Sequence, residues 1–188
     1  MSILQFLVWL FGPNSPEASP TLPIQDPQPR EATSPSHEVI RAVDRRARYI
    51  LAQAASLEER YSKNDGPGIR LDPDLNWIII PKYSMPERWH PRWTSLMIMI
   101  PTAYPDVPPT GFYLTNTARL KSGKNDKHLF NGSPYKNVAD LSAQGWYWYC
   151  VHAKVQEAGG WRPSNDPNAS DNLFTFLNMA REALTTDD

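Results

Sequence analysis

One proline-rich stretch decides how the middle of the chain can fold. It reads Ile98-Met99-Ile100-Pro101-Thr102-Ala103-Tyr104-Pro105-Asp106-Val107-Pro108-Pro109-Thr110-Gly111-Phe112. An apolar run ends at the first proline, a Tyr-Pro pair turns the chain, and a double proline leads into the next apolar run. Proline fixes the backbone angle φ and has no N–H to donate, so this connection is stiff and cannot pair as a strand. Taken alone, the stretch predicts a rigid link between two strands.

Runs rich in Ile, Met and aromatic residues lie on both sides of this link and predict a β-sheet. We expect strands over Leu75–Ile80, Ser95–Ile100 and Gly111–Leu114, with Ile69–Leu71 as a short edge strand. Short links between successive strands favour an antiparallel meander. Residues 115–145 are expected to be mostly loop, because Asn, Gly, Ser and Pro recur there.

Two amphipathic helices flank the predicted sheet. Apolar residues recur at spacings of three and four from about Ser36 to Ser62, and Ser36 suits the N-cap. A second helix is expected from about Asp171 to Leu184, capped by Ser170 or Asp171. The order of helix, meander, long loop and helix predicts an α+β domain whose helices cover one face or end of an antiparallel sheet.

The length and composition of the chain limit its class. The 188 residues correspond to about one domain. With 19 basic and 20 acidic residues the formal net charge is −1, which argues against non-specific nucleic-acid binding. The single cysteine can form neither an internal disulfide nor a Cys-rich zinc site, so we expect no metal and a reducing, cytoplasmic compartment.

Residues 1–35 are expected to lie outside the folded domain, which then comprises residues 36–188. Seven prolines fall between Pro13 and Pro35, a composition typical of extended, solvated linkers. The apolar run Ile3–Phe11 is shorter than the about 20 residues that cross a bilayer, and it lacks the features of a secretory leader. Two interpretations of this run are open: packing on its own domain or on a partner copy, which is at least as well supported, and a segment that contacts a membrane surface or docks a partner.

A second informative segment holds the only cysteine. It reads Gly145-Trp146-Tyr147-Trp148-Tyr149-Cys150-Val151-His152, and Trp161-Arg162-Pro163 follows it. A cysteine nucleophile reacts as the thiolate, which a nearby imidazole can favour. A lone cysteine is more often a small core residue, so spacing alone leaves both roles open. If the segment is a strand, Cys150 and His152 point to the same face of the sheet.

Together these segments resemble the ubiquitin-conjugating enzyme (UBC-like) superfamily over about residues 36–186. In that fold an N-terminal helix precedes a four-strand meander with a Tyr-Pro-x-x-Pro-Pro loop, an active-site cysteine, a Trp-x-Pro motif and C-terminal helices. The matching pieces occur here in that order, as Tyr104–Pro109, Cys150 and Trp161–Pro163. The resemblance implies the UBC-like fold and a catalytic role for Cys150.

One departure points to a branch of that superfamily. Most eukaryotic members carry His-Pro-Asn eight to ten residues before the cysteine, and its Asn supports the oxyanion. Here those positions read Asp140-Leu141-Ser142, and His128-Leu129-Phe130-Asn131 lacks the proline and lies too early. The pattern resembles the prokaryotic branch, in which a histidine follows the cysteine, as in Cys150-Val151-His152. Bacterial relatives are typically encoded beside a ubiquitin-like protein, an activating enzyme and a metal-dependent deconjugating protease, in operons linked to phage defence.

The resemblance implies an acyltransferase that uses no cofactor. Cys150 would take a ubiquitin-like modifier from an activating enzyme as a thioester and pass it to a target amine, such as a lysine. Three roles are open for His152: raising the thiolate fraction, deprotonating the attacking amine, or helping to stabilise the oxyanion.

Further side chains are candidates for supporting the oxyanion or bordering the cleft, namely Asn131, Asn165 and Asp166. For Asn165, Asp166 and Asp171 the residues themselves favour turn formation and helix capping. Family members dock the activating enzyme through basic residues of the first helix. The resemblance therefore implies such a surface at Arg41, Arg45 and Arg48, for which a solvated helix face is the alternative.

Two other functions remain open. A non-catalytic module on the same fold would bind a ubiquitin-like partner without accepting its acyl group, although variants of that type lose the cysteine. A thiol hydrolase with a Cys–His pair is the second, but such enzymes usually draw the histidine from elsewhere in the chain.

Overall fold

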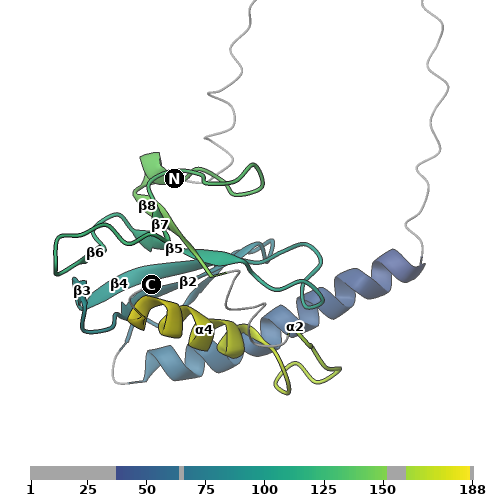
Figure 1. Ribbon diagram of the computed structural model, residues 1–188. Coiled ribbons are helices and arrows are strands. Elements are labelled where there is room, and N and C mark those ends of the chain that lie inside the picture. Colours follow the sequence, from purple (N-terminus) through teal and green to yellow (C-terminus); the bar gives the residue numbers. More distant parts are fainter. Residues whose placement is uncertain (1–36, 64–65, 152–159, 187–188) are drawn as a thin grey trace, which may run out of the picture. The chain divides into compact units, whose positions relative to one another are not determined.

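The computed structural model describes residues 37–63, 66–151 and 160–186, and the side chains from residue 44 onward within these ranges (Figure 1). Helix α2 (His37–Ser62) comes first, the strands follow, and helix α4 (Leu173–Thr185) comes last. Both helices contribute to a single apolar core together with the sheet. The α+β class and both predicted helices are confirmed, and the elements follow the order that the resemblance to the UBC-like fold implies.

Six antiparallel strands form the main sheet, in the order β1-β2-β4-β5-β8-β7. Their bounds are β1 (Arg70–Leu71), β2 (Trp77–Ser84), β4 (Trp93–Met99), β5 (Gly111–Thr115), β8 (Trp146–Cys150) and β7 (Leu129–Phe130). Strands β3 (Trp89–His90) and β6 (Arg119–Leu120) pair separately, and a 3-10 helix, η1 (Ser142–Gln144), precedes β8. The predicted four-strand meander is therefore present as β1, β2, β4 and β5.

Residues 115–145 are mostly loop, as expected, but they also contain two short strands that the sequence did not predict. This region contains β6 and β7, and the chain then returns along β5 as β8. Strands of two residues carry no periodicity that a sequence pattern could reveal. The β7–β8 pair widens the sheet beyond the meander and places Cys150 on a strand.

Strand β2 also differs from its prediction. It starts at Trp77, because Leu75 has a positive φ of 60° in a turn closed by the bond from its N–H to Asp72 O at 2.9 Å. It continues past Pro81, which lacks an N–H, by shifting register between Ile80 and Tyr83.

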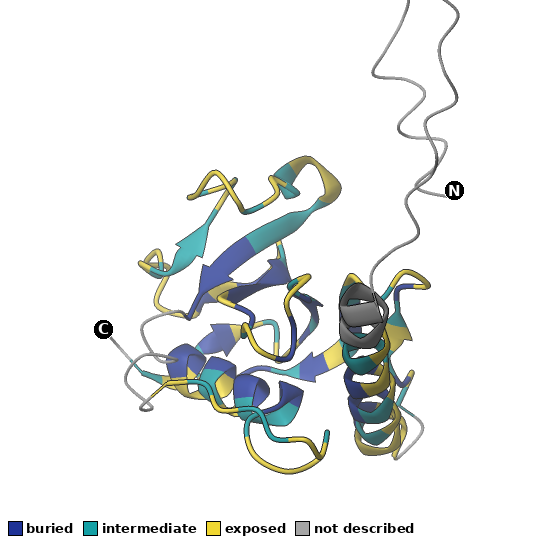
Figure 2. Ribbon diagram, turned by 90° about the vertical axis from the view of Figure 1, so that its right-hand side faces the viewer, coloured by how far each residue is buried: buried dark blue, intermediate teal, exposed yellow. Residues whose placement is uncertain are grey.

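Side chains alternate between the two faces of the sheet. Leu96 and Ile98 of β4 point into the core shared with α2 and α4, while Met97 belongs to a second cluster on the opposite face. In Figure 2 buried residues follow the central strands and the inner sides of both helices. The second cluster includes Trp148 and Cys150, so the cysteine lies on the face away from the helices.

A fully buried glutamine joins α2 to the motif loops. Gln53 Oε1 accepts hydrogen bonds from the Tyr104 hydroxyl at 2.5 Å and from Leu173 N at 3.1 Å. Gln53 Nε2 donates to Pro167 O at 2.8 Å. Trp161 Nε1 donates to Pro105 O at 2.6 Å, so the Tyr-Pro and Trp-x-Pro segments also contact each other.

The N-cap of α4 is Asn172 rather than the predicted Ser170 or Asp171. Asn172 Oδ1 accepts from Phe174 N and Thr175 N, and the Thr175 side chain completes a capping box. Asp171 instead accepts a hydrogen bond from Arg162 N at 2.6 Å, which fastens the Trp-x-Pro segment. Adjacent Asp and Asn are both good caps, so the sequence could not choose between them.

Removal of residues 1–35 should leave the fold intact. Every helix and strand described above lies beyond residue 36, and the proline-rich composition of the removed part offers little to bury. We expect a chain that begins at Ser36 to unfold cooperatively within a few degrees of the full chain in a thermal melt. A lost or broadened transition would show that Ile3–Phe11 belongs to the core.

Candidate functional site

Cys150 is the last residue of β8 and is held from both sides. It pairs with Gly111 of β5, and its N–H donates to His128 O at 3.0 Å just before β7. Its side chain is largely buried, with a relative exposure of 6% for the residue. Two flanking backbone partners thus fix the position of the thiol.

The thiol lines a cavity of about 260 Å³ together with residues of two loops. One is the proline loop (residues 100–110, between β4 and β5), and the other is the 131–141 loop between β7 and η1. The cavity is lined by Thr110, Tyr135, Asn137, Val138, Trp148 and Cys150. A second cavity of about 420 Å³ shares four of these residues and extends along Pro101 and Val107–Pro109. The Tyr-Pro-x-x-Pro-Pro loop therefore lies beside the space that Cys150 faces.

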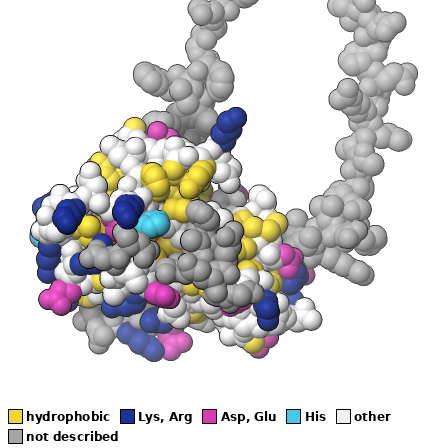
Figure 3. Space-filling model, in the orientation of Figure 1, with side chains coloured by type: hydrophobic (Ala, Val, Ile, Leu, Met, Phe, Trp, Pro, Cys, Tyr) yellow, Lys and Arg dark blue, Asp and Glu magenta, His cyan; other side chains and the backbone are white. Residues whose placement is uncertain are grey.

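Tyr135 is the side chain that contacts the thiol. Its hydroxyl and the Cys150 side chain form a hydrogen bond, and the negative charge of a Cys150 thiolate raises the pKa of the Tyr135 phenol. Tyr135 retains 47% exposure, so it lies between the cavity and solvent. Figure 3 shows hydrophobic side chains gathered on the face that holds β7 and β8, with cationic side chains beside them.

The 131–141 loop that carries Tyr135 is tied down by its own polar groups. Ser133 Oγ lies 2.5 Å from both Tyr135 O and Val138 O, and Val138 N donates to Tyr135 O at 3.1 Å. The Tyr113 hydroxyl, on β5, donates to Ala139 O at 2.6 Å. Hydrogen bonds within residues 133–138 thus hold the loop together, and the bond at Ala139 anchors it to the sheet.

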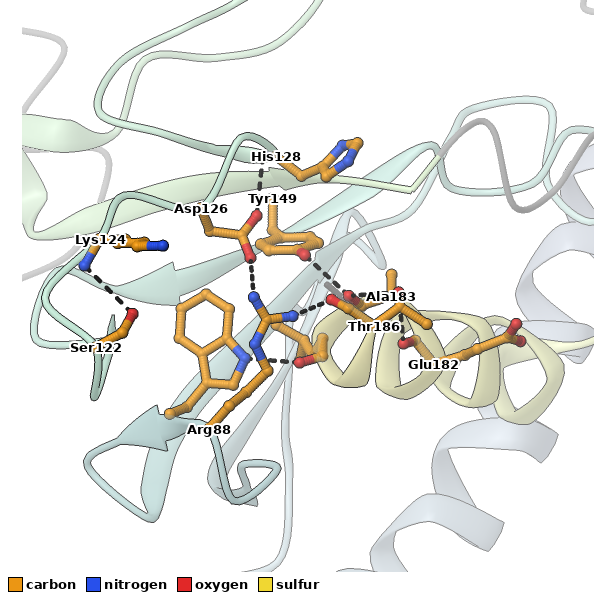
Figure 4. Close-up of polar contacts among 11 residues, drawn as sticks. Arg88, Ser122, Lys124, Asp126, His128, Tyr149, Glu182, Ala183 and Thr186 are labelled. Atoms are coloured by element: carbon orange, nitrogen blue, oxygen red, sulfur yellow. Dashed lines mark hydrogen bonds and ion pairs between the residues drawn. The ribbon is translucent and has the colours of Figure 1, made fainter. Parts of the chain in front are cut away.

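A polar network holds the chain ahead of β7 against the end of α4 (Figure 4). Asp126 accepts from His128 N at 2.9 Å and forms an ion pair with Arg88 at 3.4 Å, and Arg88 also donates to Thr186 O. The Tyr149 hydroxyl donates to Ala183 O at 3.1 Å. In Figure 4 the His128 ring points away from the Arg88–Asp126 pair, and its centroid lies 6.0 Å from that of Tyr149. The end of α4 therefore supports Tyr149, the residue before Cys150 on β8, and Arg88 links it to the chain at Asp126, just before His128.

The predicted site residues are only partly brought together. His152 lies outside the described residues. Asn131 lines a different cavity with Trp89 and Tyr147, and Tyr147 lies on the opposite face of β8 from Cys150. Asn165 is exposed, and Asp166 forms a turn by accepting from Asn168 N at 2.9 Å. Neither residue lines the cavity of Cys150.

Arg45 and Arg46 of α2 contact the proline loop. Arg45 Nη1 lies 2.9 and 2.7 Å from the two carboxylate oxygens of Asp106, and this hydrogen bonding raises the pKa of Arg45. Arg48 is exposed and lies over the Tyr49 ring at 5.8 Å, while the Arg41 side chain lies outside the described part. Arg46, which sequence reasoning missed, donates to Leu75 O at 2.8 Å and Pro101 O at 3.2 Å.

Sequence reasoning also missed Tyr135 and Asn137, which line the cavity from 15 and 13 residues before Cys150. No motif marks them, because their approach to the thiol depends on the return of the chain along β8. Arg46 and Gln53 could have been found from the sequence. Both are polar residues on the apolar side of α2, four residues before and three residues after Ile50, where a polar side chain needs a buried partner.

Within the described ranges, no group of three or more His, Cys, Asp or Glu side chains could hold a metal ion. The same part of the chain contains no helix with the length and apolar character needed to cross a bilayer.

Comparison with known families agrees with the fold and with the order of the motifs. Residues 68–187, from just before β1 to the end of α4, match the family model described as Prokaryotic E2 family E. No curated protein and no solved structure gave a significant match. The matched range includes the proline loop, Cys150 and the Trp-x-Pro segment, and it makes up well over half of the chain. The chain thus belongs to the prokaryotic E2 family E, a branch of the UBC-like domains.

Proposed function

We propose that this protein accepts a ubiquitin-like modifier as a thioester on Cys150 and passes it to a lysine of a target protein. Membership of an E2-like family supports a role in conjugation of this kind. The observation that carries the proposal is the position of Cys150, on a braced strand end that faces a cavity beside the Tyr-Pro-x-x-Pro-Pro loop.

The reaction would proceed through two acyl transfers. The Cys150 thiolate attacks the carbonyl carbon of the thioester on the activating enzyme, and the thiolate of that enzyme leaves. The lysine amine then attacks the new thioester, loses a proton and displaces the Cys150 thiolate. Both steps pass through a tetrahedral oxyanion, which hydrogen-bond donors stabilise.

Partners follow from the same proposal. The activating enzyme would dock on the basic residues of α2, with Arg41, Arg45 and Arg48 as the candidate contacts. Arg45 already holds Asp106 of the proline loop, so such docking would reach the loop that borders the cavity. The resemblance to bacterial relatives suggests an anti-phage conjugation system, which the neighbouring genes would test.

One observation favours a second candidate function, a non-catalytic module that binds a ubiquitin-like partner. Cys150 is 6% exposed and hydrogen-bonded to Tyr135, as a structural thiol would be. Acyl transfer from this position requires Tyr135 to move or to share the cavity with the acyl group. The two functions differ in one measurable product, the covalent adduct.

The test is a loading reaction with a candidate modifier, its activating enzyme and ATP, analysed by non-reducing gel and intact mass. We expect an adduct of one modifier on this protein that reductant removes. Binding of the modifier without an adduct would contradict the proposal and favour the non-catalytic module. Thioester turnover without an acceptor amine would indicate a hydrolase instead.

Replacement of His152 by alanine should slow discharge more than loading. An acceptor lysine with a pKa near 10.4 is almost wholly protonated at neutral pH, so a base has most to contribute when the amine attacks. We expect His152→Ala to keep most of the thioester formation but to slow single-turnover discharge to free lysine by at least about tenfold. Equal discharge rates for variant and wild type would contradict this role.

Two other histidines serve as comparisons in that experiment. His90→Ala changes an exposed residue of β3 and should leave discharge unchanged. His128→Ala changes the residue whose carbonyl holds Cys150 N. If His128→Ala slows discharge and His152→Ala does not, the base is His128 and the assignment to His152 is wrong.

A further inference from the structure

The position of Tyr135 indicates a role in the acyl transfer proposed above, on which this inference rests. We infer that the Tyr135 hydroxyl donates a hydrogen bond to the oxyanion that forms each time Cys150 accepts or releases an acyl group. Tyr135 and Cys150 line the same cavity and are hydrogen-bonded to each other. A donor that reaches the sulfur also reaches an oxygen attached to the carbon that the sulfur attacks.

Hydrogen bonds hold the backbone of the loop at Tyr135, and its hydroxyl is hydrogen-bonded to the Cys150 side chain. Ser133 Oγ fixes the carbonyls of Tyr135 and Val138, and the Tyr113 hydroxyl ties Ala139 to β5. Electrostatic stabilisation of an oxyanion depends on donors that are already oriented before the charge develops. The raised pKa of Tyr135 beside the Cys150 charge keeps the phenol protonated, which is the form that donates.

The Trp148 side chain forms part of the wall of the same cavity. Trp148 is 4% exposed, and within the described part of the chain its indole N–H has no hydrogen-bond partner. Asn137 brings an amide to this cavity as well. Such a lining matches an acyl chain that carries carbonyl oxygens.

The chemical step balances without a co-reactant. The Cys150 thiol gives its proton to solvent, and the sulfur forms a bond to the thioester carbonyl carbon. The π electrons move onto oxygen, where the Tyr135 O–H donates a hydrogen bond without losing its proton. Collapse restores the carbonyl and expels the donor thiolate, which takes up a proton from solvent.

The experiment compares two reactions of the same thiol and needs no protein partner. In the first, the mercaptoethanesulfonate thioester of N-acetylglycine transfers its acyl group to Cys150, as followed by intact mass. In the second, iodoacetamide alkylates Cys150 by displacement, which forms no oxyanion. Tyr135→Phe removes the hydroxyl and keeps the ring. Tyr147→Phe, three residues before Cys150 on the opposite face of β8, is the matched control.

We expect Tyr135→Phe to slow acyl transfer by at least about tenfold and alkylation by less than about threefold, whereas Tyr147→Phe changes neither. The expected loss is below the 10²–10³ of a water-excluded oxyanion hole, because Tyr135 is 47% exposed and water replaces part of its effect. Thermal melts of both variants check that the fold is kept.

Each of the other outcomes contradicts either the proposed function or the role of Tyr135. If the wild-type thiol is alkylated but takes no acyl group from the thioester, the proposed function and this inference both fail. If wild type is acylated and Tyr135→Phe is acylated equally fast, only the role of Tyr135 fails. If both reactions slow equally, Tyr135 acts on the thiol rather than on the oxyanion, and the inference is wrong.

Discussion

Replacing Cys150 by alanine should abolish the reductant-sensitive adduct completely. Cys150 is the only thiol in the chain, so no other side chain can form a thioester. The hydrogen bond from its N–H to His128 O and its ladder position opposite Gly111 depend on backbone atoms, which alanine preserves. Loss of the adduct therefore reports the missing sulfur and not a displaced strand. The measurement is the loading reaction, analysed with and without reductant.

A serine variant gives the matching control. Cys150→Ser keeps a nucleophilic oxygen at the same strand position and should yield, at most, an adduct that resists reductant, since an oxyester is not cleaved by thiols. An adduct on Cys150→Ala that is as abundant and as reductant-sensitive as that of wild type would refute the assignment of Cys150 as acyl acceptor.

Replacing Gln53 by alanine should cause the largest loss of stability among polar substitutions in the helices. The change leaves the Tyr104 hydroxyl, Leu173 N and Pro167 O without their partner in a site where Gln53 has no exposure. A buried polar group left unsatisfied costs about 1–3 kcal/mol. We expect a loss of about 2–4 kcal/mol in the free energy of unfolding, since the groups can partly relax. Denaturant titration with a constant m-value would measure it.

Two further variants serve as comparisons for the stability measurement on Gln53→Ala. Gln144→Ala removes an exposed glutamine of η1 and should change stability by less than about 0.5 kcal/mol. Tyr104→Phe removes one of the three partners of Gln53. Its loss in free energy of unfolding should lie between those of Gln144→Ala and Gln53→Ala, at about 1 kcal/mol. A loss below about 1 kcal/mol for Gln53→Ala would show that water or rearrangement replaces the glutamine.

The fold was predictable where periodicity or proline marks an element. The spacing along α2 and the proline loop after β4 located the first helix and the meander within a few residues. The run Trp146–Tyr149 was harder to assign, because both faces of β8 are covered and large aromatic residues replace the alternation of a half-exposed strand. Because β8 was not assigned from the sequence, nothing in the sequence indicated that β7 pairs with it.

The site was predictable as far as motif order reaches. Cys150 was selected because it stands between the Pro-Pro loop and Trp161-Arg162-Pro163. Tyr135 and Asn137, which line the same cavity, could not be predicted from the sequence. They approach the thiol only because the 131–141 loop crosses the aromatic face of the sheet, which is a feature of the tertiary structure. Asn131 was predicted as a site residue but lines a different cavity, although it directly follows β7 in sequence.

The strand ladders on both sides of Cys150 have a consequence for how this domain can diversify. The sulfur is placed by main-chain bonds from β5 and from the residue before β7, which most side-chain substitutions do not disturb. The outer wall of its cavity comes from a surface loop, and such loops tolerate changes in length and composition. Exchange of the 131–141 loop between homologues should therefore transplant a preference for one acyl group over another while the nucleophile stays where it is. The position of the nucleophile and the selectivity for the acyl group thus depend on separate parts of the chain.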